Sequence, residues 1–155
     1  MKLWKIALLA AVILLPKLGT PAVDVGRLEP VQAVLLTGTE HSVELRTDTD
    51  AVGEGKTLAE AVAALRSGAS REVFLDTADF LLLSGEIPSN EALLEAFRPA
   101  CAVCRTDSDT DPEAAAAYLR QHPPTRTLGE LRAGLPEVEK LTITERGGVL
   151  CRIPS

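Results

Sequence analysis

Residues 31–36, with the sequence VQAVLL, form an almost continuous run of apolar side chains. A strand of this kind belongs in the middle of a sheet, because other elements must cover both of its faces. The segment from Ser42 to Asp48 alternates instead between inward-facing and charged side chains, as a strand with one wet face does. With the polar turn from Gly38 to His41 between them, the two segments predict a β-hairpin at the centre of the fold.

The first expected helix has a complete start signal. Gly53 and Gly55 are expected to break the chain, and Thr57-Leu-Ala-Glu60 then forms a capping box, in which threonine and glutamate satisfy free amides of the first turn. The apolar residues that follow lie at helical spacing and predict one buried stripe, consisting of Leu58, Ala61, Val62 and Leu65. Gly68 is placed to end this helix.

Three more helices are expected, each from a capping residue. They begin at Ser89 or Asn90, at Asp111-Pro112-Glu113, and at Thr127-Leu-Gly-Glu130, the last closing near Gly134. The first of these three buries Leu93, Leu94 and Phe97, and the second runs to about Gln121.

Further strands are expected within 72–83 and over 100–105. A final hairpin of residues 140–145 and 149–153 is expected around the turn Arg146-Gly-Gly148. Helices are thus interleaved with strands in the order β-β-α-β-α-β-α-α-β-β. This order predicts the α/β (α+β) class: a single small domain in which a mixed β-sheet has helices packed on it.

The N-terminus resembles an export signal. Lys2 and Lys5 precede an uninterrupted apolar run from Ile6 to Leu15, which Pro16 closes. About ten apolar residues are too few for a spanning helix, which favours a cleaved peptide over a retained signal anchor or a buried helix. We therefore expect residues 1–22 to be a signal segment and residues 23–155 to be one exported, extracytoplasmic domain, membrane-associated only if the segment is retained.

Charge narrows the choice of partners. Residues 1–22 hold three of the 16 basic residues and none of the 22 acidic ones, so the mature chain has a net charge of −9. Nucleic acid and anionic lipid surfaces repel such a chain, and we expect neither as a partner.

Two motifs are incomplete. Gly55-Lys-Thr57 opens a helix as a phosphate loop does, but Asp50 stands where that loop needs its first glycine. Asp107, Asp109 and Asp111 begin like a calcium loop, yet Pro112 occupies its glycine position and Tyr118 its closing glutamate position. We expect no cofactor and no metal from either motif.

The cysteines offer more than one interpretation. Cys101 and Cys104 have redox or half-zinc spacing, but a strand directs residues three apart to opposite faces, so both are expected to be structural. Cys151 could lie cross-strand from either of them and form a disulfide, whereas the apolar neighbours equally suit buried free thiols.

No complete catalytic constellation is apparent. Neither His41 nor His122 has an obvious nucleophile and orienting carboxylate beside it. Asp76 and Asp79 could pair for acid–base work, although short acidic residues beside strands more often cap or end them. A non-enzymatic domain is therefore expected, with a small exported redox or hydrolytic enzyme as the alternative.

Two runs resemble the N-terminal domain of the Ger(x)C spore-germination proteins. The first is Gly53-Glu-Gly-Lys-Thr-Leu-Ala-Glu-Ala61, and the second is Arg71-Glu-Val-Phe-Leu-Asp-Thr-Ala-Asp-Phe-Leu-Leu-Leu-Ser-Gly-Glu86. In that family a similar capped helix leads to a strand that ends in a Gly-Glu or Ser-Glu step. The order of later elements is also similar, and the resemblance covers roughly residues 29–122.

The resemblance implies a non-enzymatic subunit that works beside membrane receptor proteins in the envelope of a spore-forming bacterium. The chain departs from the family in two respects. Family members usually carry a lipid-modified cysteine just after the signal, whereas the first cysteine here is Cys101, so no direct lipid anchor is expected. They also have a large C-terminal domain where this chain has the expected hairpin.

The mature protein should lack residues 1 to about 22, because a short apolar run is removed by signal peptidase instead of being held in the bilayer. Intact-mass spectrometry of the exported protein measures this directly. Recovery of the full-length chain from the membrane fraction would show instead that the segment is a signal anchor.

Overall fold

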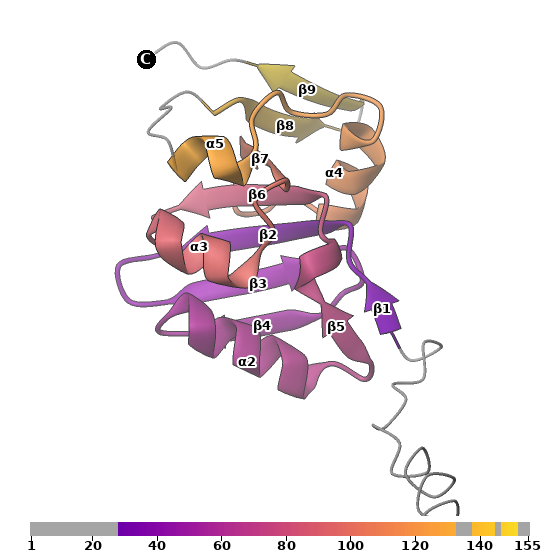
Figure 1. Cartoon of the computed structure of the whole chain (residues 1–155). Helices are drawn as coiled ribbons and strands as arrows, with labels where there is room; N and C mark the ends of the chain where they lie inside the picture. The colour runs from indigo at the N-terminus through magenta and orange to yellow at the C-terminus, as the bar shows by residue number, and fades with distance from the viewer. Residues whose placement is uncertain (1–27, 133–137, 145–146, 152–155) are drawn as a thin grey trace, which may run out of the picture.

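The fold is built on one mixed seven-stranded sheet. The computed structural model describes residues 28–132, 138–144 and 147–151, and the predicted signal segment lies outside these ranges. The strand order is β4-β3-β2-β6-β7-β8-β9 (Figure 1). The strands are β2 (Ala33–Gly38), β3 (Val43–Thr47), β4 (Val52–Gly55), β6 (Phe80–Gly85), β7 (Ala102–Arg105), β8 (Lys140–Thr144) and β9 (Gly147–Cys151). The predicted α/β fold with a mixed sheet is confirmed.

The centre of the sheet is parallel and its margins are antiparallel. β2, β6, β7 and β8 run in the same direction, while β3 at one margin and β9 at the other run against it; β4 is antiparallel to β3 and so has the direction of β2. Among the described residues, β8 is joined to β7 by the single register pair Arg105↔Lys140. The last hairpin is therefore attached to the sheet more loosely than the central strands are to each other.

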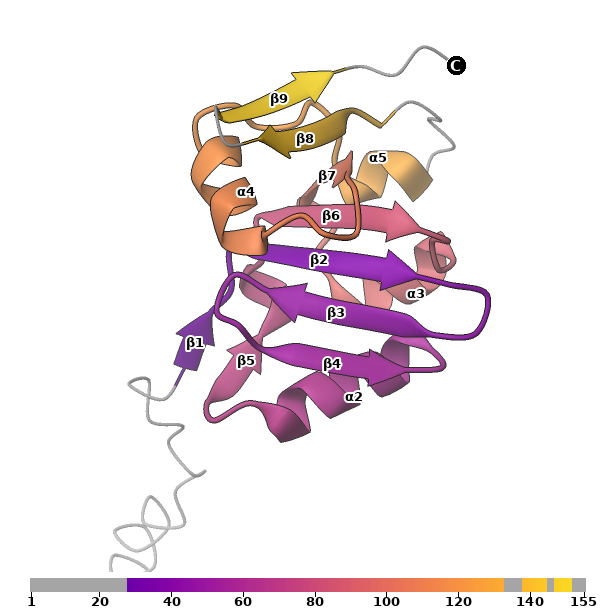
Figure 2. The same cartoon turned by 180° about the vertical axis from the view of Figure 1, so that it is seen from behind.

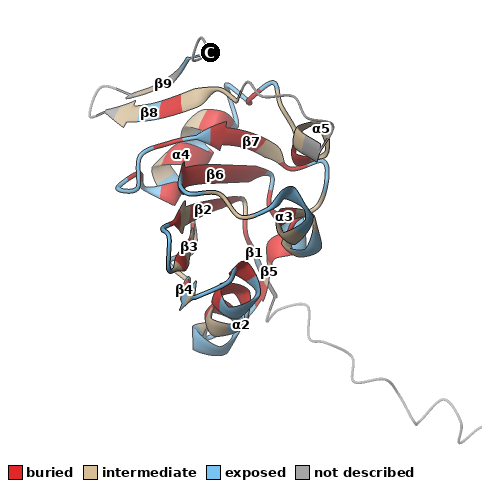
Figure 3. Ribbon diagram, turned by 90° about the vertical axis from the view of Figure 1, so that its left-hand side faces the viewer, coloured by how far each residue is buried: buried red, intermediate tan, exposed pale blue. Residues whose placement is uncertain are grey.

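The apolar run at residues 31–36 supplies the central strand, as predicted. Val34 and Leu36 belong to one hydrophobic cluster, and Ala33 and Leu35 to another on the opposite face. All four are essentially inaccessible to water. The neighbouring strand β6 is buried along nearly its whole length (Figure 3).

Helices cover both faces of the sheet. α2 (Leu58–Gly68), α3 (Asn90–Ala96) and α5 (Leu128–Arg132) lie on one face, and α4 (Pro112–Leu119) lies on the other (Figures 1 and 2). The two clusters are separated by the sheet itself, so the chain has a three-layer core.

The helix starts follow the sequence signals. Thr57 accepts a hydrogen bond from the Glu60 amide at 3.3 Å, and the Glu60 carboxylate accepts one from the Lys56 amide at 2.8 Å. The predicted stripe of α2 is the buried one. Ser89 and Asp111 cap α3 and α4. The predicted end of the last helix at Gly134 lies outside the described residues.

The expected break at Gly53 and Gly55 is wrong: these glycines form β4, which pairs with β3. A Cβ atom on Gly53 would lie 2.3 Å from the Ala61 carbonyl oxygen of α2. The glycines therefore serve close packing of helix on strand instead of a turn, a use that strand-forming propensity does not reveal.

Two short features were not anticipated. β1 (Leu28–Pro30) and β5 (Glu72–Phe74) form a separate two-stranded parallel sheet. A 3-10 turn, Leu75–Thr77, then joins β5 to β6. In the C-terminal hairpin, which is confirmed, Gly147 and Gly148 belong to β9 and not to the turn. None of the helices in the described residues is long and apolar enough to cross a membrane.

Replacing Gly53 with alanine should lower the free energy of unfolding by about 1–3 kcal/mol, because the added methyl group overpacks the contact between α2 and β4. Gly68→Ala is the matched control, since a Cβ atom there meets nothing closer than 3.9 Å and alanine favours the helix. Urea denaturation of both variants measures the difference. Equal stability of the two would contradict this account of β4.

Candidate functional site

The two cysteines of the Cys-x-x-Cys motif lie on opposite sides of the sheet. Cys101 packs in the cluster under α2 and α3, and Cys104 in the cluster under α4. Both are fully buried and neither is in a disulfide. Removal from water raises the pKa of each thiol from 9.0 to about 12, so both remain protonated at neutral pH.

Cys151 is not a cross-strand neighbour of either buried cysteine, contrary to the sequence-based expectation. It lies on β9, opposite Lys140 of β8, and β8 separates it from β7. Its thiol is free and it is exposed. The expectation assumed that the last strand would lie next to β7, and the order of strands cannot be read from local pattern.

Residues of the two incomplete motifs form helix caps and an ion pair. Thr57 of the apparent phosphate loop caps α2. Asp111 of the apparent calcium loop caps α4, and Asp107 forms an ion pair with Lys140 at 3.0 Å. Within the described ranges, no three acidic, histidine or cysteine residues lie close enough to hold a metal ion together.

The histidines and paired aspartates are likewise dispersed. His41 lies in an exposed turn, with its ring 4.0 Å from the Glu40 carboxylate. His122 stacks on Tyr118, with ring centroids 4.6 Å apart. Asp79 forms an ion pair with Arg98, whereas Asp76 is exposed and lines a cavity near β5. These four candidates therefore do not meet at one site.

Asp48 is a partly buried carboxyl group. Burial raises its pKa, and hydrogen bonds from the backbone, of which that from the Gln32 amide is the strongest, act in the opposite direction. Its two oxygens lie 3.1 and 3.2 Å from the Gln32 nitrogen. Asp48 thus joins the end of β3 to the start of β2, which is a structural role.

A concave surface of the described residues lies between two helices, α2 and α3. This helical groove has a volume of about 350 Å³, and mostly small side chains line it. Its lining consists of Thr57, Leu58, Ala59, Val62 and Arg66 of α2 and Ala92, Glu95 and Ala96 of α3. Five of these residues are apolar, and Arg66 and Glu95 are the charged ones.

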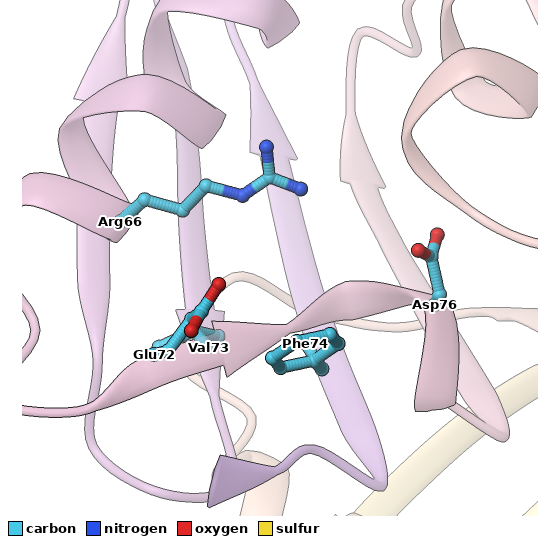
Figure 4. A pocket seen from close by; sticks show the side chains of 5 residues that line it. All are labelled: Arg66, Glu72, Val73, Phe74 and Asp76. Carbon is cyan, nitrogen blue, oxygen red and sulfur yellow. The ribbon is translucent and has the colours of Figure 1, made fainter. Parts of the chain in front are cut away.

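A second cavity, of about 300 Å³, lies next to the helical groove. Arg66 lines both, and the second is completed by Glu72, Val73, Phe74 and Asp76. Arg66 extends from α2 toward the segment that carries Glu72 and Asp76, and among the described residues it forms no ion pair with either (Figure 4). Three carboxylates and one guanidinium thus border the two cavities.

Sequence reasoning missed this surface. The alanines of α2 and α3 were expected only to form helices, and the signal available was their small size at positions next to the buried stripes. Which helices become neighbours depends on tertiary packing. No family model matches the chain, and no match was found among curated proteins or solved structures.

Stability should fall as the pH rises above about 9, because the unfolded chain releases the protons of Cys101 and Cys104 there while the folded chain holds them until about pH 12. The folded state then binds more protons, and each thiol contributes a slope of about 1.4 kcal/mol per pH unit. Urea denaturation across this range measures the slope. In a Cys101→Ala/Cys104→Ala variant, less stable overall, the slope should become much shallower. An unchanged slope would show that other groups cause it.

Proposed function

We propose that this chain is an exported, non-enzymatic domain that binds another protein of the cell or spore envelope. The observation that carries the proposal is the helical groove. Val62, Ala92 and Ala96 line a concave surface where a partner can bury apolar side chains against two preformed helices. Small side chains leave the room that a bound segment needs.

Charge around the groove favours a basic partner. Glu95, Glu72 and Asp76 border the two cavities, and among the described residues Arg66 is the one cation that lines them. The chain as a whole is acidic, so its field attracts a positive surface. We therefore expect the partner segment to have small apolar side chains that contact the apolar residues of the groove, with lysine or arginine beside them.

The resemblance to Ger(x)C N-terminal domains supports the same class of function. It implies membrane receptor proteins as partners in a spore-forming bacterium, and the predicted export signal would place the domain on their side of the membrane. An extracytoplasmic segment of such a receptor, with basic residues next to small apolar ones, is the partner we propose.

The alternative is a small exported redox or hydrolytic enzyme. The Cys-x-x-Cys spacing favours it, but thiol chemistry proceeds through the thiolate. With pKa values of about 12, Cys101 and Cys104 have almost no thiolate at neutral pH. Turnover in a disulfide-exchange or hydrolase screen, with no captured partner, would favour the enzyme.

Crosslinking capture from sporulating cells, with the mature domain as bait, should recover a membrane receptor subunit. Glu95→Lys should weaken binding of that partner about tenfold, because it reverses a charge at the contact. Glu91→Lys is the matched control, since Glu91 is exposed on the same helix and does not line the groove. Titration calorimetry with the captured partner measures both effects.

Two tryptophan substitutions distinguish binding in the groove from a general attraction between charged surfaces. Ala59→Trp fills the groove, whereas Ala63→Trp places the same ring on an exposed position of α2 that does not line it. Only the first should block binding. Added salt should weaken the complex. Equal effects of the two tryptophans, or binding that is indifferent to salt, would contradict the proposed contact surface.

A further inference from the structure

The two edge strands of the sheet each have one exposed valine side chain. Val52 of β4 and Val149 of β9 are each 53 % exposed, and they are the large hydrophobic residues exposed in the described ranges. An edge strand also has unpaired backbone groups that another strand can bind, so natural proteins protect such edges with charge, proline or a covering element. The two edges of this sheet differ in that protection.

The β4 edge is protected. Glu54 is exposed on this strand and lies opposite Glu44 of β3, so an approaching acidic chain meets two carboxylates. Helix α2 also packs along β4. Both features oppose the addition of a strand at this edge.

Within the ranges that the structure describes, the β9 edge has neither protection. The strand Gly147–Cys151 reads GGVLC and contains no charged residue and no proline. A Cβ atom on Gly148 would lie 2.6 Å from the Tyr118 ring, so this glycine lets the strand lie directly against α4. Because side chains alternate along a strand, Val149 projects from the opposite face, where it is exposed.

The register of the hairpin determines which backbone groups of β9 are available. Thr144 pairs with Gly147 across a two-residue connection, and such a closing pair is hydrogen-bonded. Bonded and non-bonded pairs alternate in an antiparallel ladder. The amides and carbonyls of Gly148 and Leu150 therefore point away from β8, toward the open edge.

We propose that a second copy of this chain binds here, with its β9 antiparallel to the first, so that two seven-stranded sheets join into one. An identical antiparallel strand presents the same spacing of donors and acceptors, and the contact closes by a two-fold axis. Two acidic chains repel each other, whereas the five residues of β9 carry no charge of their own. The dimer leaves the helical groove of each copy free, since α2 lies at the β4 end of the sheet (Figure 1).

The association is expected to be weak, because pairing of two five-residue strands buries less than the roughly 1,200 Å² of stable complexes. Analytical ultracentrifugation of the mature chain over a wide concentration range should show a reversible monomer–dimer equilibrium. Added salt should strengthen this dimer by screening repulsion, the reverse of its expected effect on the proposed envelope partner.

Val149→Lys should raise the dimer dissociation constant at least about tenfold. The substitution places a lysine of each chain at the contact, where the two positive charges lose water and repel each other. Val52→Lys is the matched control on the other edge and should leave the dimer intact. A wild-type chain that stays monomeric at every concentration, or equal effects of the two lysines, would overturn the proposal. A monomeric chain that loses an envelope partner through Val149→Lys would show that β9 binds a different protein, which also overturns it. Loss of groove binding in the Glu95→Lys variant bears only on the other site.

Discussion

The fold depends on one constraint, the burial of β2 on both faces. A single covering layer buries only one face of a strand that has apolar side chains on both faces. The chain must therefore supply helices on both sides of the sheet. The parallel pairing of β2 with β6 follows from this, because parallel neighbours require long connections and those connections provide the helices. The polar margins β3 and β4 then close one side with a tight antiparallel hairpin.

Local signals predicted much of this arrangement and failed where a neighbour decided the outcome. The Thr57 and Asp111 caps, the buried stripe of α2 and the first hairpin follow from interactions within a few residues, and the structure has all of them. The role of Gly53 was misinterpreted because this glycine allows helix α2 to pack closely on β4, and the local sequence does not show where that helix will lie. The position of Cys151 was misjudged for a similar reason, since strand order is a property of the whole sheet.

The candidate site could be predicted less well than the fold. Residues with reactive side chains drew attention in the sequence, yet in the structure the thiols of Cys101 and Cys104 are packing groups and Asp111 is a helix cap. The helical groove is made of residues such as Ala59, Ala92 and Ala96, whose chemistry is unremarkable. It exists because two helices with small side chains pack on the same face of a sheet, and only the assembled fold brings them together.

The single register pair between β7 and β8 has a consequence for motion. Besides that pair, the described connections of the last hairpin to the strands before it are few: the amide of Arg105 to the Glu139 carbonyl, the Thr106 hydroxyl to the Leu141 carbonyl, and the Lys140–Asp107 ion pair. The amides of β8 and β9 should accordingly exchange with solvent as one cooperative group, at a lower free energy of opening than those of β2 and β6. Each such opening would turn the interior strand β7 into a temporary edge, so the chain would have its greatest exposure to proteases and to misassembly at its C-terminal end.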